Sequence, residues 1–231
     1  YWESQGDAIM DADLSTAGPL STSADSNNHY TLAYYQNGHV AMYRATGLTK
    51  YLDRALLYIN NVIAAATTQA GGYLGWKSSV DGNAEASLRE VYFWRYACMT
   101  LDAMANAGAL TGSYLTQYNA ILAFIERNIW TKWYSRGVSS NIYRSVVHIC
   151  AHWAIISDFL ARRSANTAIV SQAVAILDAI DHGGMPNWNG DSIRSMIVAH
   201  PNDALACFWH AYFPKVAGGG TAPGIPAEDT N

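Results

Sequence analysis

The chain has 231 residues and a mass of 25.2 kDa, with 50% hydrophobic and only 14% charged residues. Lys and Arg number 14 against 18 Asp and Glu, which gives a net charge of −4. This balance excludes the basic footprint of a nucleic-acid-binding protein and a polybasic membrane patch. No apolar run reaches the roughly 20 residues that span a bilayer, so membrane insertion is not expected either.

The cysteines indicate neither a disulfide framework nor a zinc knuckle. Cys98, Cys150 and Cys207 are odd in number, widely spaced and embedded in apolar segments, so we expect free, buried thiols. The chain begins at Tyr1 without a methionine, and it is poor in Lys but rich in Ser, Thr and Asn. These features favour an exported protein, extracellular or periplasmic.

In chain order, residues 1–28 are mixed in character and predict an N-terminal arm or loop, with Gly18-Pro19 and a polar stretch inside it. A 3.6-residue hydrophobic period then begins and defines a helical domain over 29–216. A Gly- and Pro-rich tail or linker, 217–231, follows. The predicted helices are 29–46, 49–67, 84–107, 113–132, 142–163, 165–181 and 202–213.

Helix-end residues support these boundaries. Gly47, Gly108 and Gly183-Gly184 stand where helices should stop. Thr49 and either Asn202 or Asp203 are expected N-caps. The segment 72–76 is expected to be a short extended piece.

Helix pairs start near residues 30, 86 and 142, with a fourth start near 202, so the period is about 56 residues. The first helix of each pair carries Tyr, Trp, His and Arg, whereas the second has a simpler Ala/Leu/Ile stripe. Stacked αα-hairpins bury each other's faces and would form an inner and an outer ring. We therefore predict an all-α, (α/α)-toroid-like barrel. Three pairs and one further helix do not close a six- or seven-pair ring, so the barrel is expected to be open or incomplete.

Two stretches resemble known carbohydrate-active enzymes. The segment 43–55, YRATGLTKYLDRA, resembles the turn between inner and outer helices of (α/α)-toroid enzymes. The segment 72–76, GYLGW, followed by LREVY at 88–92, resembles a loop and inner helix of secreted uronate polysaccharide lyases of that fold. The resemblance covers roughly residues 29–213 and implies a polysaccharide substrate. The hairpin signature also occurs in glycosidases and sugar epimerases, so it bears on fold more than on reaction.

The first candidate site is a polar stripe on the predicted helix 142–163. Arg144, His148 and His152 follow one another at four-residue spacing, with Asn141 and Tyr143 at the helix start. A lyase needs a cation or amide to neutralise the uronate carboxylate, and Tyr or His to move protons. The alternative is that the histidines satisfy hydrogen bonds in the core.

A metal site is the lesser interpretation of the same stripe. His148 and His152 have HxxxH spacing, and a third ligand could come from His200, Asp203 or His210. No Glu lies between the two histidines, so the metalloprotease motif is absent. We predict no cofactor, with a divalent metal at His148 and His152 as the alternative.

The second candidate site lies on the predicted helix 84–107. Glu85, Arg89, Tyr92 and Tyr96 share one face, and Trp94 lies on an adjacent face. Arg89 would bind a carboxylate, Tyr92 would carry a proton or support a sugar ring, and Trp94 would add binding surface. The alternative is a helical Glu85–Arg89 pair above two core tyrosines.

Two further groups complete the candidate sites. The first group lies at the start of the first helix, where aromatic rings could stack on sugars and amides could bind hydroxyls; it consists of Asn28, His29, Tyr30, Tyr34, Tyr35 and Asn37. His200 precedes a predicted helix, where free N–H groups favour an anion. The alternatives are a tyrosine-rich core helix with an Asn cap and a plain Asp203 cap.

These residues lead us to expect a lyase that cleaves a uronic-acid polysaccharide, such as alginate or glucuronan, by β-elimination. Tyr143 and His148 would share the acid–base work, with His152 and Tyr92 as the next candidates. Arg89, Arg144 and Asn141 would neutralise the carboxylate. One alternative is a toroid glycoside hydrolase using a carboxylate pair, drawn from Glu85, Glu90 and Asp203. Another is a non-catalytic helical module that binds carbohydrate or protein. The expected partner is a polysaccharide, and the expected state is a monomer.

Overall fold

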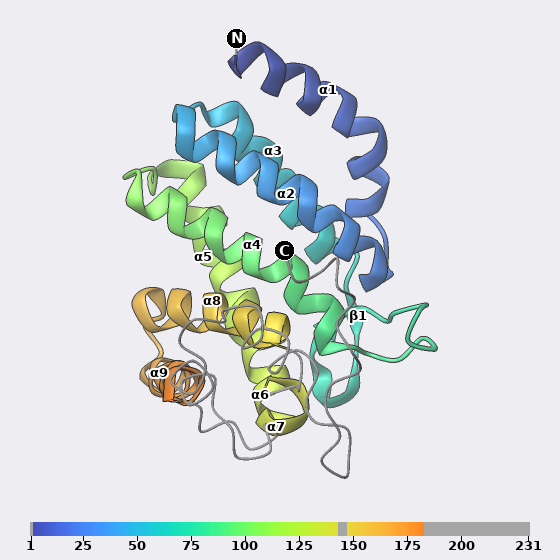
Figure 1. The fold of residues 1–231 in the computed structure, drawn as a ribbon, viewed down its shortest axis with the longest axis vertical. Helices are drawn as coiled ribbons and strands as arrows, with labels where there is room; N and C mark the ends of the chain where they lie inside the picture. The colour runs from blue at the N-terminus through green and yellow to red at the C-terminus, as the bar shows by residue number, and fades with distance from the viewer. Residues whose placement is uncertain (1, 143–146, 183–231) are drawn as a thin grey trace, which may run out of the picture. The chain divides into compact units, whose positions relative to one another are not determined.

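The computed structural model describes residues 2–142 and 147–182, and these segments are predominantly helical (Figure 1). This confirms the all-α class. Contacts divide the chain into two compact units, Tyr1–Lys132 and Trp133–Asn231. The division falls inside the domain predicted over 29–216. The predicted helix 202–213 and the tail 217–231 lie outside the described residues. None of the described helices is both long and apolar enough to cross a membrane.

The first unit opens with α1 (Trp2–Ser21), so the prediction of an arm or loop over 1–28 is wrong for these residues. Gly18 and Pro19 suggested a break, but tertiary contacts outweigh their weak helix propensity. The Arg54 guanidinium donates a 3.0 Å hydrogen bond to the Met10 carbonyl, and Lys50 pairs with Asp7 at 2.7 Å. Both contacts come from α3 and hold α1 against it.

The next two helices are α2 (Ser26–Thr46) and α3 (Thr49–Ala64). The Asp25 side chain caps α2 by accepting the Asn27 N–H at 2.9 Å. Gly47 ends α2 at φ 69°, as predicted, and donates its N–H to the Tyr43 carbonyl. The predicted N-cap at Thr49 is wrong, because Leu48 occupies the cap position without a side-chain hydrogen bond.

The helix α4 (Ser87–Asn106) ends in a Schellman motif. The N–H of Gly108, at φ 69°, bonds the Ala105 carbonyl, and the N–H of Ala109 bonds the Met104 carbonyl. The predicted stop at Gly108 is therefore confirmed. The following helical run consists of α5 (Gly112–Phe124), the π-helix η2 (Ile125–Thr131) and α6 (Lys132–Ser135), where the sequence predicted one regular helix.

A short hairpin separates α3 from α4. Strands β1 (Thr67–Thr68) and β2 (Leu74–Gly75) pair antiparallel, in the register Thr67↔Gly75, around the 3₁₀ turn η1 (Ala70–Gly72). The extended segment predicted near 72–76 is thus confirmed in β2. The helix predicted to reach residue 67 stops instead at Ala64. Trp76, fully buried, donates its indole N–H to the Val62 carbonyl at 3.0 Å and ties the hairpin to α3.

A buried ion pair joins this hairpin to α4 and to the end of the π-helix. Lys132 Nζ lies 2.8 and 2.7 Å from the two carboxylate oxygens of Glu90, and both side chains are fully buried. Gln69 accepts a third bond from Lys132 at 3.1 Å. Gly75 leaves room for this cluster, because a Cβ there would lie 2.6 Å from Lys132 Nζ. One cation and its acceptors therefore hold together three segments distant in sequence.

The second unit contains α7 (Val138–Asn141), α8 (Val147–Arg163) and α9 (Thr167–His182), with α8 and α9 packed together. Asn166 caps α9 by accepting the Ala168 N–H at 3.1 Å. Cys150 here and Cys98 in the first unit are free and buried, as predicted, and burial raises the pKa of both thiols. Cys207 lies outside the described residues.

The buried pair generates a stability prediction. Lys132→Met leaves the Glu90 carboxylate buried without its cation, so the free energy of unfolding should fall by about 3–5 kcal/mol. The double variant Lys132→Met/Glu90→Leu should recover most of that loss, since no charge then remains buried. Urea unfolding followed by tryptophan fluorescence measures both. Lys50→Met, which breaks a partly exposed pair, is the control and should change stability far less. Equal losses in the single and double variants would contradict this account of the pair.

Candidate functional site: the tyrosine–arginine seam of α2 and α4

Helices α2 and α4 pack side by side within the first unit (Figure 1). They run in the same direction, because Tyr30 meets Tyr92 near their starts and Gln36 donates to Thr100 at 3.0 Å further along. Residues three and four apart on each helix form stripes that meet along the line of contact. We call this row of side chains the seam: Tyr30, Tyr34, Arg44, Arg89, Tyr92, Arg95 and Tyr96.

Tyrosine rings form the first half of the seam. The ring centroids of Tyr30 and Tyr92 are 4.1 Å apart, and Tyr34 stands edge-on to Tyr30 at 6.1 Å. Tyr34 is 60% exposed, so its ring is available to a ligand. Hydrogen bonding with Tyr92 raises the pKa of Tyr30, and hydrogen bonding with Tyr30 raises the pKa of Tyr34. Both phenols are therefore protonated at neutral pH and can act as hydrogen-bond donors.

Guanidinium groups lie over these rings. Arg89 is 5.7 Å from the Tyr30 centroid, and Arg95 is 5.2 Å from the Tyr92 centroid. Arg95 also donates a 2.9 Å bond to the Tyr96 hydroxyl. Cation–π contacts of this kind hold arginines in place while their outer N–H groups can bind carboxylates. The seam thus combines aromatic rings, of the kind that stack on sugars, with guanidinium groups, of the kind that bind carboxylates.

The third arginine extends the seam towards the C-terminal ends of both helices. Arg44 on α2 donates a 3.2 Å bond to the Met99 carbonyl on α4. Beyond it lies a pocket of about 370 Å³, lined by Tyr43, Arg44, Ala103 and Asn106 among others. The cationic character therefore continues along the contact of the two helices.

The loop before α4 borders the start of the seam. Arg89 forms a 3.0 Å ion pair with Asp81 of this loop. Asp25, the cap of α2, also accepts hydrogen bonds from the backbone and hydroxyl of Ser79. These bonds outweigh the effect of burial and lower the pKa of Asp25. One carboxylate thereby fixes both the helix start and the loop beside the seam.

Two predicted binding residues of these helices are in the core instead. His29 is 1% exposed and Trp94 is fully buried, which contradicts a role in contacting substrate. Trp94 stacks on Phe124 at 5.1 Å, and His29 stands edge-on to Trp76 at 5.2 Å. Asn28 is half-buried, and its amide donates to the Ser23 hydroxyl at 2.8 Å.

The predicted stripe of the second unit is described only in part. Tyr143, Arg144 and His200 lie outside the described residues, as does the side chain of His148. His152 is 5% exposed on α8. The Asn141 amide donates to the carbonyls of Gly137 and Arg136 at 3.0 and 3.2 Å, so it closes the α7 turn. Of the predicted site residues, the structure brings together Tyr34, Arg89 and Tyr92.

Metal and carboxylate chemistry find little support in the described part of the chain. Within residues 2–142 and 147–182, no group of three His, Cys, Asp or Glu side chains is placed to hold a metal ion. The side chain of His148 lies outside the described residues, so the alternative of a metal at His148 and His152 stays a prediction. Glu90, a candidate hydrolase carboxylate, is buried against Lys132 and does not reach a substrate.

Sequence reasoning missed Arg44 and Arg95 as site residues, and it did not place Tyr30 beside Tyr92. Their spacing on α2 and α4 was visible, but the pairing of the two helices was needed to place them together. No protein-family model, curated protein or solved structure matches the chain. The chemistry of the seam therefore carries the functional inference.

The buried histidines make stability depend on pH. Burial lowers the pKa of His29 and of His39 to about 4, and His29 Nε2 lies 2.9 Å from the Ser23 carbonyl, so this nitrogen carries the proton. Between pH 6.5 and 4, a histidine in the unfolded chain, with a pKa near 6.5, binds a proton, whereas the two buried histidines of the folded protein stay neutral. Stability should thus be complete above about pH 6.5 and decline on acidification, by up to about 3 kcal/mol per histidine.

His29→Gln retains an N–H donor but removes the titrating group. It should remove the part of the pH dependence of unfolding free energy between pH 6.5 and 4 that His29 contributes and leave the part due to His39, as measured by urea unfolding at several pH values. A slope identical to that of the wild-type protein would contradict the assignment of His29 as a neutral core residue.

Proposed function

We propose that the protein binds a uronic-acid polysaccharide along the seam and cleaves it by β-elimination. The observation that supports this most directly is the stacking of Arg89 on Tyr30 and of Arg95 on Tyr92. Tyrosine faces suit pyranose rings, and guanidinium groups suit carboxylates in bidentate geometry. A polymer with a carboxylate on each ring needs both groups in alternation.

We further propose that α2 and α4 are neighbouring inner helices of an open (α/α) toroid, with α3 and α5 outside them. Two features support this: α2 and α4 run in the same direction, and the tight Gly47 turn leads from α2 into α3. Stacked αα-hairpins have this arrangement of alternate helices. Such an enzyme acts on polymer outside the cytoplasm, as an extracellular or periplasmic monomer.

In the proposed reaction, Arg95 neutralises the uronate carboxylate, which acidifies the proton on C5. Arg89, whose Nε is paired with Asp81, contributes through its other guanidinium N–H groups. A base takes that proton, the bond from C4 to the glycosidic oxygen breaks, and an acid protonates the leaving oxygen. Tyr92 is the seam's candidate for proton transfer, because its ring lies between Arg95 and Tyr30. Tyr143 and His148 keep their acid–base role as sequence predictions.

A second candidate function is non-catalytic binding of the same class of polymer. The exposed ring of Tyr34 beside that of Tyr30 favours it, because aromatic faces and phenol hydroxyls can bind a saccharide without transferring a proton. The two functions share the seam and differ only in turnover. An assay that records both binding and elimination therefore separates them.

The test uses alginate, glucuronan and polygalacturonate, with ultraviolet absorbance to follow the unsaturated uronate that elimination creates. On the polymer that is cleaved, Tyr92→Phe should lower the rate at least about 100-fold, in line with loss of an acid–base group. Arg95→Gln should weaken binding at least about tenfold, a loss of about 1.4 kcal/mol. The matched controls are Tyr114→Phe on α5 and Arg127→Gln in η2, which should change neither quantity.

Each outcome bears on one part of the proposal. Elimination that is unaffected by Tyr92→Phe would remove Tyr92 from the chemistry. If the ultraviolet absorbance stays constant and Arg95→Gln abolishes polymer binding, the non-catalytic binding function is supported instead. Binding or cleavage that neither seam variant changes would overturn the seam as the site.

A further inference from the structure

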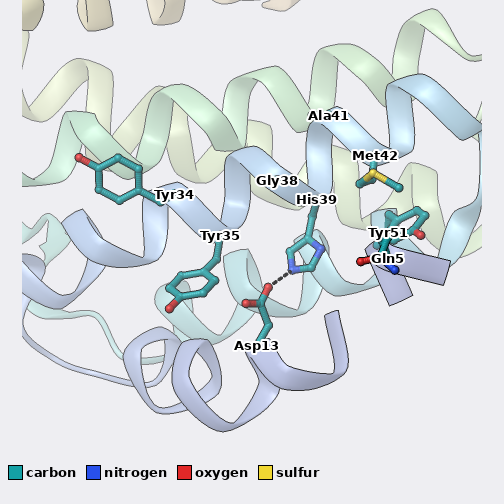
Figure 2. Close-up of a pocket in the computed structure, with 10 residues that line it drawn as sticks. Gln5, Asp13, Tyr34, Tyr35, Gly38, His39, Ala41, Met42 and Tyr51 are labelled. Atoms are coloured by element: carbon teal, nitrogen blue, oxygen red, sulfur yellow. Dashed lines mark ion pairs between the residues drawn. The ribbon is translucent and has the colours of Figure 1, made fainter. Parts of the chain in front are cut away.

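A second concave site lies where α1 packs against α2 and α3. It is a pocket of about 560 Å³, within the range of cavities that hold small molecules. Figure 2 shows Tyr34 and Tyr35 towards one end and Met42 with Tyr51 towards the other. Only Tyr34 belongs to both this pocket and the seam.

A histidine–aspartate pair forms the polar part of the pocket wall, between the two aromatic ends (Figure 2). His39 Nε2 lies 3.2 Å from Asp13 Oδ2, and the side chains are 4% and 8% exposed. Nε2 nevertheless has no hydrogen bond of acceptable geometry. A buried ring nitrogen without a hydrogen bond, in the wall of a cavity, is a group that a ligand hydroxyl can satisfy.

The charges of the pocket differ from those of the seam. Burial, with a smaller effect of Arg54, lowers the pKa of His39 to about 4, so the imidazole is neutral at physiological pH. Burial raises the pKa of Asp13, against an opposing effect of Arg54. The residues that line the pocket include no Lys or Arg, and the Arg54 guanidinium donates to the Met10 carbonyl. Nothing in this lining compensates the carboxylate of a uronate.

Gly38 indicates that the pocket is kept open. It lies inside α2, where glycine is destabilising relative to alanine. A Cβ built on Gly38 meets no atom within 4 Å, so packing does not require glycine there. Gly6 on α1 is the contrast, because a Cβ there would lie 2.6 Å from Met42 Cε and from the Tyr51 hydroxyl. The missing side chain at Gly38 instead adds to the space of the pocket.

We infer that this pocket is a subsite for an uncharged sugar residue, distinct from the uronate-binding seam. Tyr34 and Tyr35 would stack on the ring, while His39 Nε2 and the Asp13 carboxylate would bind its hydroxyls. The inference builds on the proposed function, because Tyr34 connects the pocket to the seam. The protein would then select polymers in which neutral sugars accompany uronates.

Titration calorimetry with neutral and acidic trisaccharides tests this. The neutral probes are cellotriose, mannotriose and β-1,4-galactotriose, and the acidic probes are trimannuronate and trigalacturonate. In Gly38→Leu, a side chain fills the pocket, and binding of the neutral probe should weaken at least tenfold while acidic binding is unchanged. Ala120→Leu, exposed on α5 and outside both the pocket and the seam, is the control and should bind both classes like the wild-type protein.

A further variant guards against misfolding. Gly38→Ala meets no neighbouring atom, so its melting temperature should equal or exceed that of the wild-type protein, and it should weaken neutral binding less than leucine does. Failure of the wild-type protein to bind any neutral probe, or equal neutral binding by Gly38→Leu, would overturn the pocket inference. Failure of acidic binding alone would overturn the proposed function and leave the neutral subsite supported.

Discussion

The buried contact between Lys132 and Glu90 is the constraint on which the first unit depends. A buried cation has no water to solvate it and needs hydrogen-bond acceptors that are held in place. Glu90 and Gln69 supply these acceptors to Lys132. The π-helix ends directly before Lys132, and it also places Asn128 so that its side chain accepts the Leu74 N–H at 2.8 Å. Helix α4, the hairpin and η2 with Lys132 therefore cannot shift independently, since any shift would leave a charge unpaired.

That constraint extends to the surface. The hairpin continues into Trp76 and Lys77, and the Lys77 carbonyl accepts the Ser26 N–H at 2.9 Å, at the first residue of α2. Asp25 and Ser79 reinforce the same junction. The start of α2 is thus held in register with α4, which carries Glu90 one residue after Arg89. These core contacts fix the register of α2 against α4, and this register places rings and guanidinium groups alternately along the seam.

Sequence periodicity predicted most of the helices and the stops at Gly47 and Gly108, because these features are local. It missed α1, because the glycines and the proline in this segment predict a break in the helix. The contacts of Arg54 and Lys50 that stabilise α1 cannot be seen in the sequence. It also placed His29 and Trp94 in a binding site, because a 3.6-residue period shows which residues share a helix face but not whether that face is buried. The sequence around Lys132 did not indicate its role, because a single lysine in an apolar run does not reveal its partner Glu90, which is 42 residues away in sequence. The seam needed the pairing of two helices sixty residues apart in sequence.

The central claim is that an acidic saccharide binds along α2 and α4. The most direct test is to follow backbone amide resonances of the 25.2 kDa chain by nuclear magnetic resonance during titration with trimannuronate and trigalacturonate. We expect concentration-dependent shifts concentrated in residues 26–46 and 87–106, with the largest near Arg89, Tyr92 and Arg95. Saturable shifts confined to other segments, with those two helices unchanged, would contradict it.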